Sequence, residues 1–360
     1  MTPPAAAPAP ASLSADAEYD KGAALAADGK FDEARAVFQA AAQADPQHST
    51  LSAVITMFRD VDEGRLSREV IQRLFRAMQH ANADRWAEAN ADVDEAVKLA
   101  PASVRTHTTR GGILLRQGKF DAALEIFNQV LELDPKFAEG HYNRGATYAE
   151  MGRYDAAIAD YTRAIELEPS FSDAYRNRGA AYTHKNNVSA AFSDLTKAHE
   201  LHPRDAETLY LRGMLYALTG KWTEAEADYT RVIERDPEHA QAFYDRGLAF
   251  QNLGNDDRAF ADWTRAIELN PANPAALINR GLVFARRKQF DQAIADYDKA
   301  LAADATMVVA HFNRALALEQ LGRPKEAIAA YRTFLQRAGA GQPALAAEAR
   351  KRLAALEKEP

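Results

Sequence analysis

The chain has 360 residues, of which 47% are hydrophobic and 26% charged, and its formal net charge is -7. This composition supplies enough apolar surface for a core, and the negative charge argues against nucleic acid as a partner. The sequence contains no cysteine, which excludes disulfides, thiolate nucleophiles and cysteine-based zinc sites.

Residues 1–14, MTPPAAAPAPASLS, are rich in alanine and proline and contain neither a basic residue nor a long apolar run. They match neither a secretory signal nor a membrane span. We predict a disordered tail over these residues. Because no signal peptide or membrane-spanning segment is visible, we expect a cytoplasmic protein without a membrane span.

The next three segments carry helical patterns of unequal regularity. Residues 15–48 place glycine, alanine and aromatic residues at the spacing of two paired helices. Residues 70–103 do so more loosely, and His80 stands where an aromatic residue or leucine is usual. Between them, 49–69 form an insertion whose apolar residues predict one extra helix, and these are Leu51, Val54, Ile55 and Phe58.

From residue 104 to 341 the sequence repeats every 34 residues without a gap, in blocks that begin at 104, 138, 172, 206, 240, 274 and 308. Small or aromatic residues recur at block positions 4, 8 and 11 and again at 20, 24 and 27, which is the spacing of a helix face. Position 15 is usually glycine, which can turn the chain, and a proline at position 32 usually stops the second helix. Each block is therefore predicted to be a helix, a turn and a second helix.

Residues 343–358 follow the last block and predict a terminal capping helix. Its apolar stripe consists of Leu345, Ala349, Leu353 and Leu356, and its basic residues lie mostly off that stripe. A polar outer face is expected of a helix that ends a stack of repeats.

Block 138–171 resembles the tetratricopeptide repeat family most fully, through Gly145, Tyr148, Gly152, Tyr154, Ala157, Tyr161, Ala164 and Pro169. The resemblance covers nearly everything from residue 15 onward. It implies an all-α fold, an α-solenoid built as a right-handed superhelix of helix-turn-helix repeats. It also implies that the first helices of the repeats line an inner, concave surface.

Arginine occupies position 7 in all seven blocks, beside the buried stripe, where its charge requires a partner. Aspartate at position 23 of five blocks can supply one. Pairing within a block and pairing with the next block are both open. The second is favoured, since helices across a block junction also run antiparallel. The expected ion-pair residues are Asp160, Arg178, Asp194, Arg212, Asp228, Arg246, Asp262, Arg280, Asp296 and Arg314.

Positions 2, 6, 9 and 13 of the first helices form a stripe opposite the packed one, with position 5 beside it, and we call this surface the groove face. Asparagine disfavours the middle of a helix, yet it recurs at position 6, and its amide can both donate to and accept from a peptide backbone. The series resembles the asparagine ladder in the repeats of O-linked N-acetylglucosamine transferase, while repeat consensus and packing explain these residues equally well. The candidate peptide-binding residues are Asn143, Asn177, Asp245, Asn279, Asn313, Tyr142, Tyr210, Tyr244 and Phe312.

The polar recurrences all follow the 34-residue period, whereas an active site is normally a unique constellation. We therefore expect no enzyme, no cofactor and no metal site. The main hypothesis is a scaffold that binds an extended peptide or a helix of a partner protein in the concave groove. The alternative is a self-associating assembly subunit that uses the irregular segment 49–103. The charge preference of a ligand stays open, because acidic residues at position 2 alternate with arginines nearby.

Overall fold

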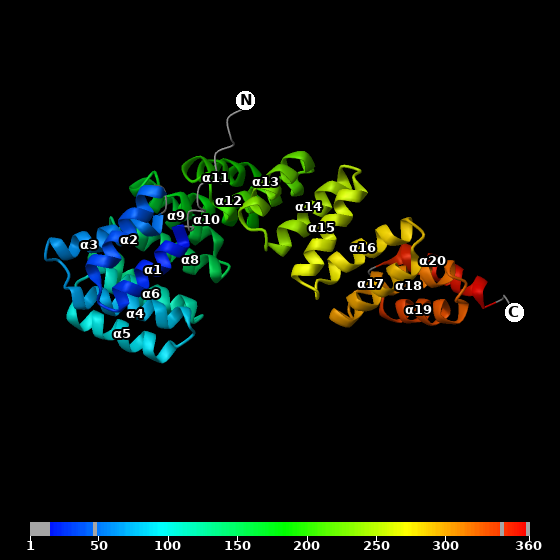
Figure 1. Ribbon diagram of the computed structural model, residues 1–360, viewed down its shortest axis with the longest axis horizontal. Coiled ribbons are helices and arrows are strands. Elements are labelled where there is room, and N and C mark those ends of the chain that lie inside the picture. The colour runs from blue at the N-terminus through cyan, green and yellow to red at the C-terminus, as the bar shows by residue number, and fades with distance from the viewer. Residues whose placement is uncertain (1–14, 46–48, 339–341, 358–360) are drawn as a thin grey trace, which may run out of the picture. The chain divides into compact units, whose positions relative to one another are not determined.

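The computed structural model describes residues 15–45, 49–338 and 342–357 (Figure 1). The predicted tail, 1–14, lies outside the described residues. All regular structure in the described ranges is α-helical and amounts to twenty helices. The predicted all-α class is therefore confirmed for this part of the chain.

The chain divides into two compact units, residues 1–208 and 209–360, with the division inside α12 (Ala206–Leu218). Unit 1 contains α1 (Ala15–Ala27), α2 (Phe31–Ala44), α3 (Ser49–Asp62), α4 (Arg68–Asn82), α5 (Trp86–Leu99), α6 (Val104–Arg116), α7 (Phe120–Leu133), α8 (Ala138–Glu150), α9 (Tyr154–Leu167), α10 (Ser172–His184) and α11 (Val188–Leu201). Unit 2 contains α13 (Trp222–Arg235), α14 (Ala240–Asn252), α15 (Asp256–Leu269), α16 (Pro274–Arg286), α17 (Phe290–Ala303), α18 (Val308–Gln320), α19 (Pro324–Arg337) and α20 (Pro343–Leu356).

Within each unit, consecutive helices pack as hairpins, and each hairpin packs against the next. In unit 1, α8 packs on α9 and α9 on α10; in unit 2, α16 packs on α17 and α17 on α18. The core residues come from block positions 20, 24 and 27, as Ala157, Tyr161 and Ala164 illustrate. The solenoid packing implied by the family resemblance is confirmed within each unit.

The turn inside each hairpin depends on a left-handed residue at position 15. Gly118 has a φ of 70° there, and even the non-glycine residues Asp84, Asn186 and Lys288 have φ values of 55°, 57° and 60°. A left-handed residue directly after a helix lets the chain reverse within a few residues. The second helix of a repeat therefore begins close to the end of the first, and the two helices run antiparallel.

Position 8 lets the two helices approach closely. A Cβ atom built on Gly247 would lie 2.5 Å from Nε1 of Trp263, a distance that real Cβ atoms do not tolerate. Trp263 is completely buried and fills the space that the glycine leaves. This contact sets the distance between α14 and α15. It thereby also fixes their register, that is, which side chains of the two helices lie opposite each other along the helix axes.

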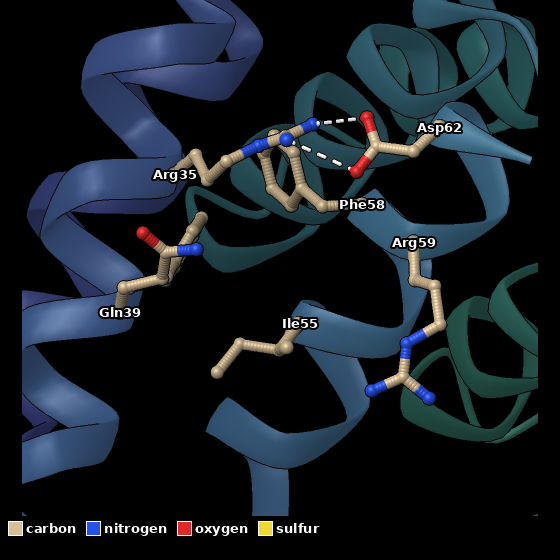
Figure 2. Close-up of a pocket in the computed structure, with 7 residues that line it drawn as sticks. Arg35, Gln39, Ile55, Phe58, Arg59 and Asp62 are labelled. Atoms are coloured by element: carbon tan, nitrogen blue, oxygen red, sulfur yellow. Dashed lines mark hydrogen bonds and ion pairs between the residues drawn. The ribbon is translucent and has the colours of Figure 1, made fainter.

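The inserted helix α3 is held against α2 by an aromatic cluster and an ion pair. Phe58 of α3 lies 5.8 Å from Phe38 of α2 between ring centroids. Arg35 lies over the Phe58 ring and donates two hydrogen bonds to the Asp62 carboxylate, at 3.0 and 2.7 Å (Figure 2). Figure 2 also shows the Arg59 side chain lying apart from this pair, across a hollow of about 180 Å³.

The insertion also brings the start of the chain against later repeats of unit 1. Asp60 of α3 accepts a hydrogen bond of 2.6 Å from Nε of Arg105 on α6. Asp45, which follows α2, lies 3.4 Å from Nε2 of His202, which follows α11. Helix α3 and the end of α2 thus contact later repeats of unit 1.

The C-terminal helix α20 packs on α19 and buries Ala346 and Ala349. No helix among the described residues is long and apolar enough to cross a membrane.

Candidate functional site

A ladder of arginine–aspartate pairs runs through the repeats, and its pairing differs from the favoured expectation. In the five repeats that begin at 138, 172, 206, 240 and 274, the arginine at position 7 donates from Nε and Nη2 to the aspartate at position 23 of its own repeat, at 2.7–2.8 Å. Pairing with the next repeat, such as Asp160 with Arg178, is therefore wrong. The observed pairs are Arg144–Asp160, Arg178–Asp194, Arg212–Asp228, Arg246–Asp262 and Arg280–Asp296.

Four of these five arginines also donate to the repeat before them. Nη1 of Arg178 donates to the Thr162 hydroxyl at 3.0 Å, and Nη1 of Arg144 donates to Oδ1 of Asn128 at 2.8 Å. Both acceptors lie at position 25 of the preceding repeat. Each of these guanidinium groups therefore ties the two helices of its own repeat together and also fixes the neighbouring repeat.

The ends of the ladder change partner. Arg314 has Ala330 at position 23 of its own repeat and donates instead to Asp298 of the preceding one, at 2.5 Å. Arg110 likewise lies 3.4 Å from Asp94. In both places the arginine's own repeat has no aspartate at position 23, and its acidic partner lies at position 25 of the repeat before.

One pair of the ladder lies in the irregular region and was missed by sequence reasoning. Asp92 is only 4% exposed and lies 3.4 Å from Nε of Arg76. It also lies within 3.4 Å of Arg73 and His80. The signal was present, because 76 and 92 are 16 residues apart, like the pairs in the regular repeats.

The ladder directs at least two N–H donors of each of these arginines to an aspartate that is almost completely buried. Asp228 is 2% exposed and Arg212 is 8% exposed. Hydrogen bonds donated to the aspartates raise the pKa of Arg144, Arg178 and Arg212 above the ordinary arginine value. We therefore expect these arginines to have a structural role and a ligand to contact other residues.

On the groove face, tyrosine at position 5 pairs with position 6 of the next repeat. Nδ2 of Asn177 donates to the Tyr142 hydroxyl at 3.0 Å in unit 1. In unit 2 the Tyr210 hydroxyl donates to Asp245 at 2.8 Å, and Tyr244 shares a hydrogen bond with Asn279. Burial is the main cause of two pKa shifts here: it raises the pKa of Tyr142 to about 12, and it raises the pKa of Asp245. Much of the predicted amide ladder therefore already has partners within the chain.

Two asparagines of the ladder lack such a tyrosine. Thr108 and Ile278 occupy position 5 in the repeats before Asn143 and Asn313. Nδ2 of Asn313 is buried without a partner, and the Asn143 side chain makes no hydrogen bond to any described residue. Phe312, the remaining aromatic candidate, is buried at 5% exposure and packs against Phe334, so it is a core residue.

A cavity of about 750 Å³ lies in unit 1 where Asn143 stands. One wall is the polar side of α3, from Thr50 to Thr56, and the opposite wall is formed by the N-terminal turns of α8 and α10. Tyr142 and Phe171 contribute rings whose centroids are 4.9 Å apart. The charged lining residues are Arg105, Lys136, Glu139, Glu168 and Asp173.

A second hollow, of about 410 Å³, lies further along the same two helices. Ala146 and Ala180 at position 9 line it together with Asn177. Their small side chains leave open space between the C-terminal halves of α8 and α10. Both hollows therefore lie on the groove face of unit 1, and both contain an asparagine of position 6. No group of three potential metal ligands occurs among the described residues.

Comparison with known proteins agrees with this repeat architecture. Models described as tetratricopeptide repeat match residues 138–171 and 206–239 and, separately, 5–49, 244–308 and 308–343. A model described as TPR repeat matches residues 111–152. A search of curated protein sequences gives no match.

Solved structures similar to this chain are also repeat proteins. The Cut9–Hcn1 hetero-tetramer of the APC/C has a TM-score of 0.58 at 17% identity, over 83% of this chain and 55% of that chain. PilF of Pseudomonas aeruginosa has a TM-score of 0.51 at 16% identity, over 55% of this chain and 90% of that one. YrrB, described as a TPR protein with an unusual peptide-binding site, has a TM-score of 0.44 at 25% identity, over 51% and 95%. Since the family models together match more than half of the sequence, the chain belongs to the tetratricopeptide repeat family.

Proposed function

We propose that this protein is a non-catalytic scaffold that binds an extended segment of a partner protein along the groove face of unit 1. The segment would run from the 750 Å³ cavity at Asn143 to the 410 Å³ hollow at Asn177. A fold of this family serves many partners, so the proposal rests on the site and not on the fold.

The observation that carries the proposal is the uncommitted amide of Asn143 inside a cavity. An asparagine amide can donate to a backbone carbonyl and accept from a backbone N–H of an extended peptide. Asn143 has no hydrogen-bond partner among the described residues, whereas Asn177 already donates one amide hydrogen to Tyr142. We expect Asn143 to contribute more to peptide binding than Asn177.

The small residues beside these amides support the same reading. Ala146 and Ala180 leave room for a backbone to approach α8 and α10, and Tyr142 and Phe171 offer apolar walls for side chains. A concave lining that combines apolar rings with a few polar groups is typical of ligand sites.

The test is selection of peptides from a random dodecapeptide display library with the full chain as bait. Dissociation constants of the selected peptides are then measured by calorimetry. We expect Asn143→Ala to weaken binding about tenfold, which corresponds to ~1.4 kcal/mol. Gln129→Ala, which removes an exposed amide from α7 outside the groove face, serves as the control and should leave binding unchanged. If no peptide is selected, or if both variants bind like the parent, the groove face of unit 1 is not the binding site.

A further inference from the structure

The cavity at Asn143 has an uneven distribution of charge. Its three lining carboxylates belong to Glu139, Glu168 and Asp173, and its two lining cations are Arg105 and Lys136. Asp173 is paired with Arg176 at 2.8 Å. Among the described residues, Glu139 and Glu168 have no ion pair, and Lys136 lies on an exposed loop without one.

Arg105 would be the natural counter-ion of Glu139, but the inserted helix engages it. Nε of Arg105 donates to Asp60 at 2.6 Å, and both side chains are only 14% and 13% exposed. Arg105 stays near enough to act on Glu139 through its charge, yet its hydrogen bond is directed to α3. The insertion therefore directs the Nε hydrogen bond of Arg105 to Asp60, so Arg105 lines the cavity without forming an ion pair with Glu139 or Glu168.

Burial is the main cause that raises the pKa of Glu139 and of Glu168, and the charge of Glu168 adds to the rise at Glu139. A carboxylate that loses water without gaining a partner is destabilised. A cation that enters the cavity would relieve this cost for Glu139, which is half-buried, and for Glu168 at the exposed rim.

The neighbouring side chains suit a basic side chain on a peptide better than a free metal ion. Rings of Tyr142 and Phe171 form an apolar wall beside the carboxylates, which can pack the methylene stem of lysine or arginine. The adjacent Asn143 amide offers a hydrogen bond to the backbone that carries such a side chain.

We propose that the cavity between α3, α8 and α10 accepts a lysine or arginine side chain of the partner segment, with Glu139 and Glu168 as its counter-ions. This inference rests on the proposed function and adds the chemical class of the segment: it is basic at the residue that enters the cavity. The occupied cavity holds one positive charge between Glu139 and the rim, while the backbone on either side continues along α8 and α10.

The same display selection tests the inference when its peptides are aligned and their basic residues replaced one at a time by glutamine. We expect one basic position to be enriched, and its replacement to weaken binding about tenfold. Glu139→Gln combined with Glu168→Gln should weaken binding of the parent peptide by a similar factor. The same double variant should scarcely affect the glutamine-substituted peptide, because the interaction is already absent. Glu132→Gln, an exposed carboxylate on α7 that does not line the cavity, is the charge-matched control.

The outcomes separate this inference from the proposed function. Peptides that bind at Asn143 but show no basic position, or whose binding ignores the Glu139 and Glu168 substitutions, overturn the basic-segment inference and leave the scaffold proposal standing. Failure to select any peptide overturns both. A coupled loss between the basic residue and the two glutamates supports both.

Discussion

Unit 1 and unit 2 share one packing skeleton and differ on the groove face. The arginine–aspartate ladder has the same geometry in Arg178–Asp194 and in Arg212–Asp228. Position 9, in contrast, changes character at the boundary between the units. It holds Gly112, Ala146 and Ala180 in unit 1 and Met214, Leu248, Leu282 and Leu316 in unit 2.

This difference shows where function is to be sought. Residues that both units keep alike pack the repeats together, and we expect the residues that change between the units to determine what each groove face binds. The hollow at Ala146 and Ala180 depends on small side chains, whereas unit 2 presents long apolar ones, with Met214 44% exposed. The two groove faces therefore should not bind the same ligand.

We expect the largest effect, a loss of folding stability, when the arginine–aspartate ladder that both units share is broken. Asp194→Ala in unit 1 and Asp228→Ala in unit 2 each remove a buried carboxylate and leave a largely buried guanidinium without its bidentate partner. We expect each to cost about 3–5 kcal/mol of unfolding free energy. Urea unfolding followed by circular dichroism measures this. Asp298→Ala is the control, because Asp298 is half exposed in its pair with Arg314, and its loss should cost about 1 kcal/mol or less.

A cost below about 1 kcal/mol for Asp194→Ala or Asp228→Ala would contradict a structural ladder. A large cost in one unit alone would show that the two skeletons are not equivalent.

We expect a smaller effect, on peptide affinity alone, when the position 9 side chains that differ between the units are exchanged. Ala146→Leu together with Ala180→Leu gives unit 1 the side chains of unit 2 and fills the 410 Å³ hollow. We expect selected peptides to bind at least tenfold more weakly, or ~1.4 kcal/mol, by calorimetry. Met214→Ala in unit 2 should leave their affinity within about twofold, a change of ~0.4 kcal/mol. Equal losses in both variants would break the distinction between the two groove faces.

The sequence predicts the repeats well because their signal is periodic, yet it does not predict the pairing of the ladder. Asp160 lies 16 residues from Arg144 and 18 from Arg178, and both flanking helices run antiparallel to its own. Sequence spacing alone does not show which of the two arginines lies opposite Asp160 along the helix axis. The close approach at position 8, as between Gly145 and Tyr161, decides for the arginine of the same repeat.

The cavity was beyond sequence reasoning for a different reason. It exists because α3 lies opposite α8 and α10, held by Asp60–Arg105, and by Asp45–His202 between the ends of α2 and α11. These partners are 45 and 157 residues apart and follow no period. The Tyr142–Asn177 bond, in contrast, was within reach, since tyrosine precedes asparagine or aspartate by 35 residues again at Tyr210–Asp245 and Tyr244–Asn279.

The smallest effect concerns the place in unit 2 where that tyrosine is missing. Ile278 leaves Nδ2 of Asn313 buried without a partner, while Tyr142 supplies a hydroxyl to Asn177 at the equivalent place in unit 1. Ile278→Tyr should restore the bond. Ile278→Phe adds the same ring without the hydroxyl, so the difference between the two variants isolates the hydrogen bond. We expect the tyrosine variant to be about 1 kcal/mol more stable than the phenylalanine variant in urea unfolding. Equal stabilities would mean that Asn313 is satisfied in another way and that the two units differ here in sequence only.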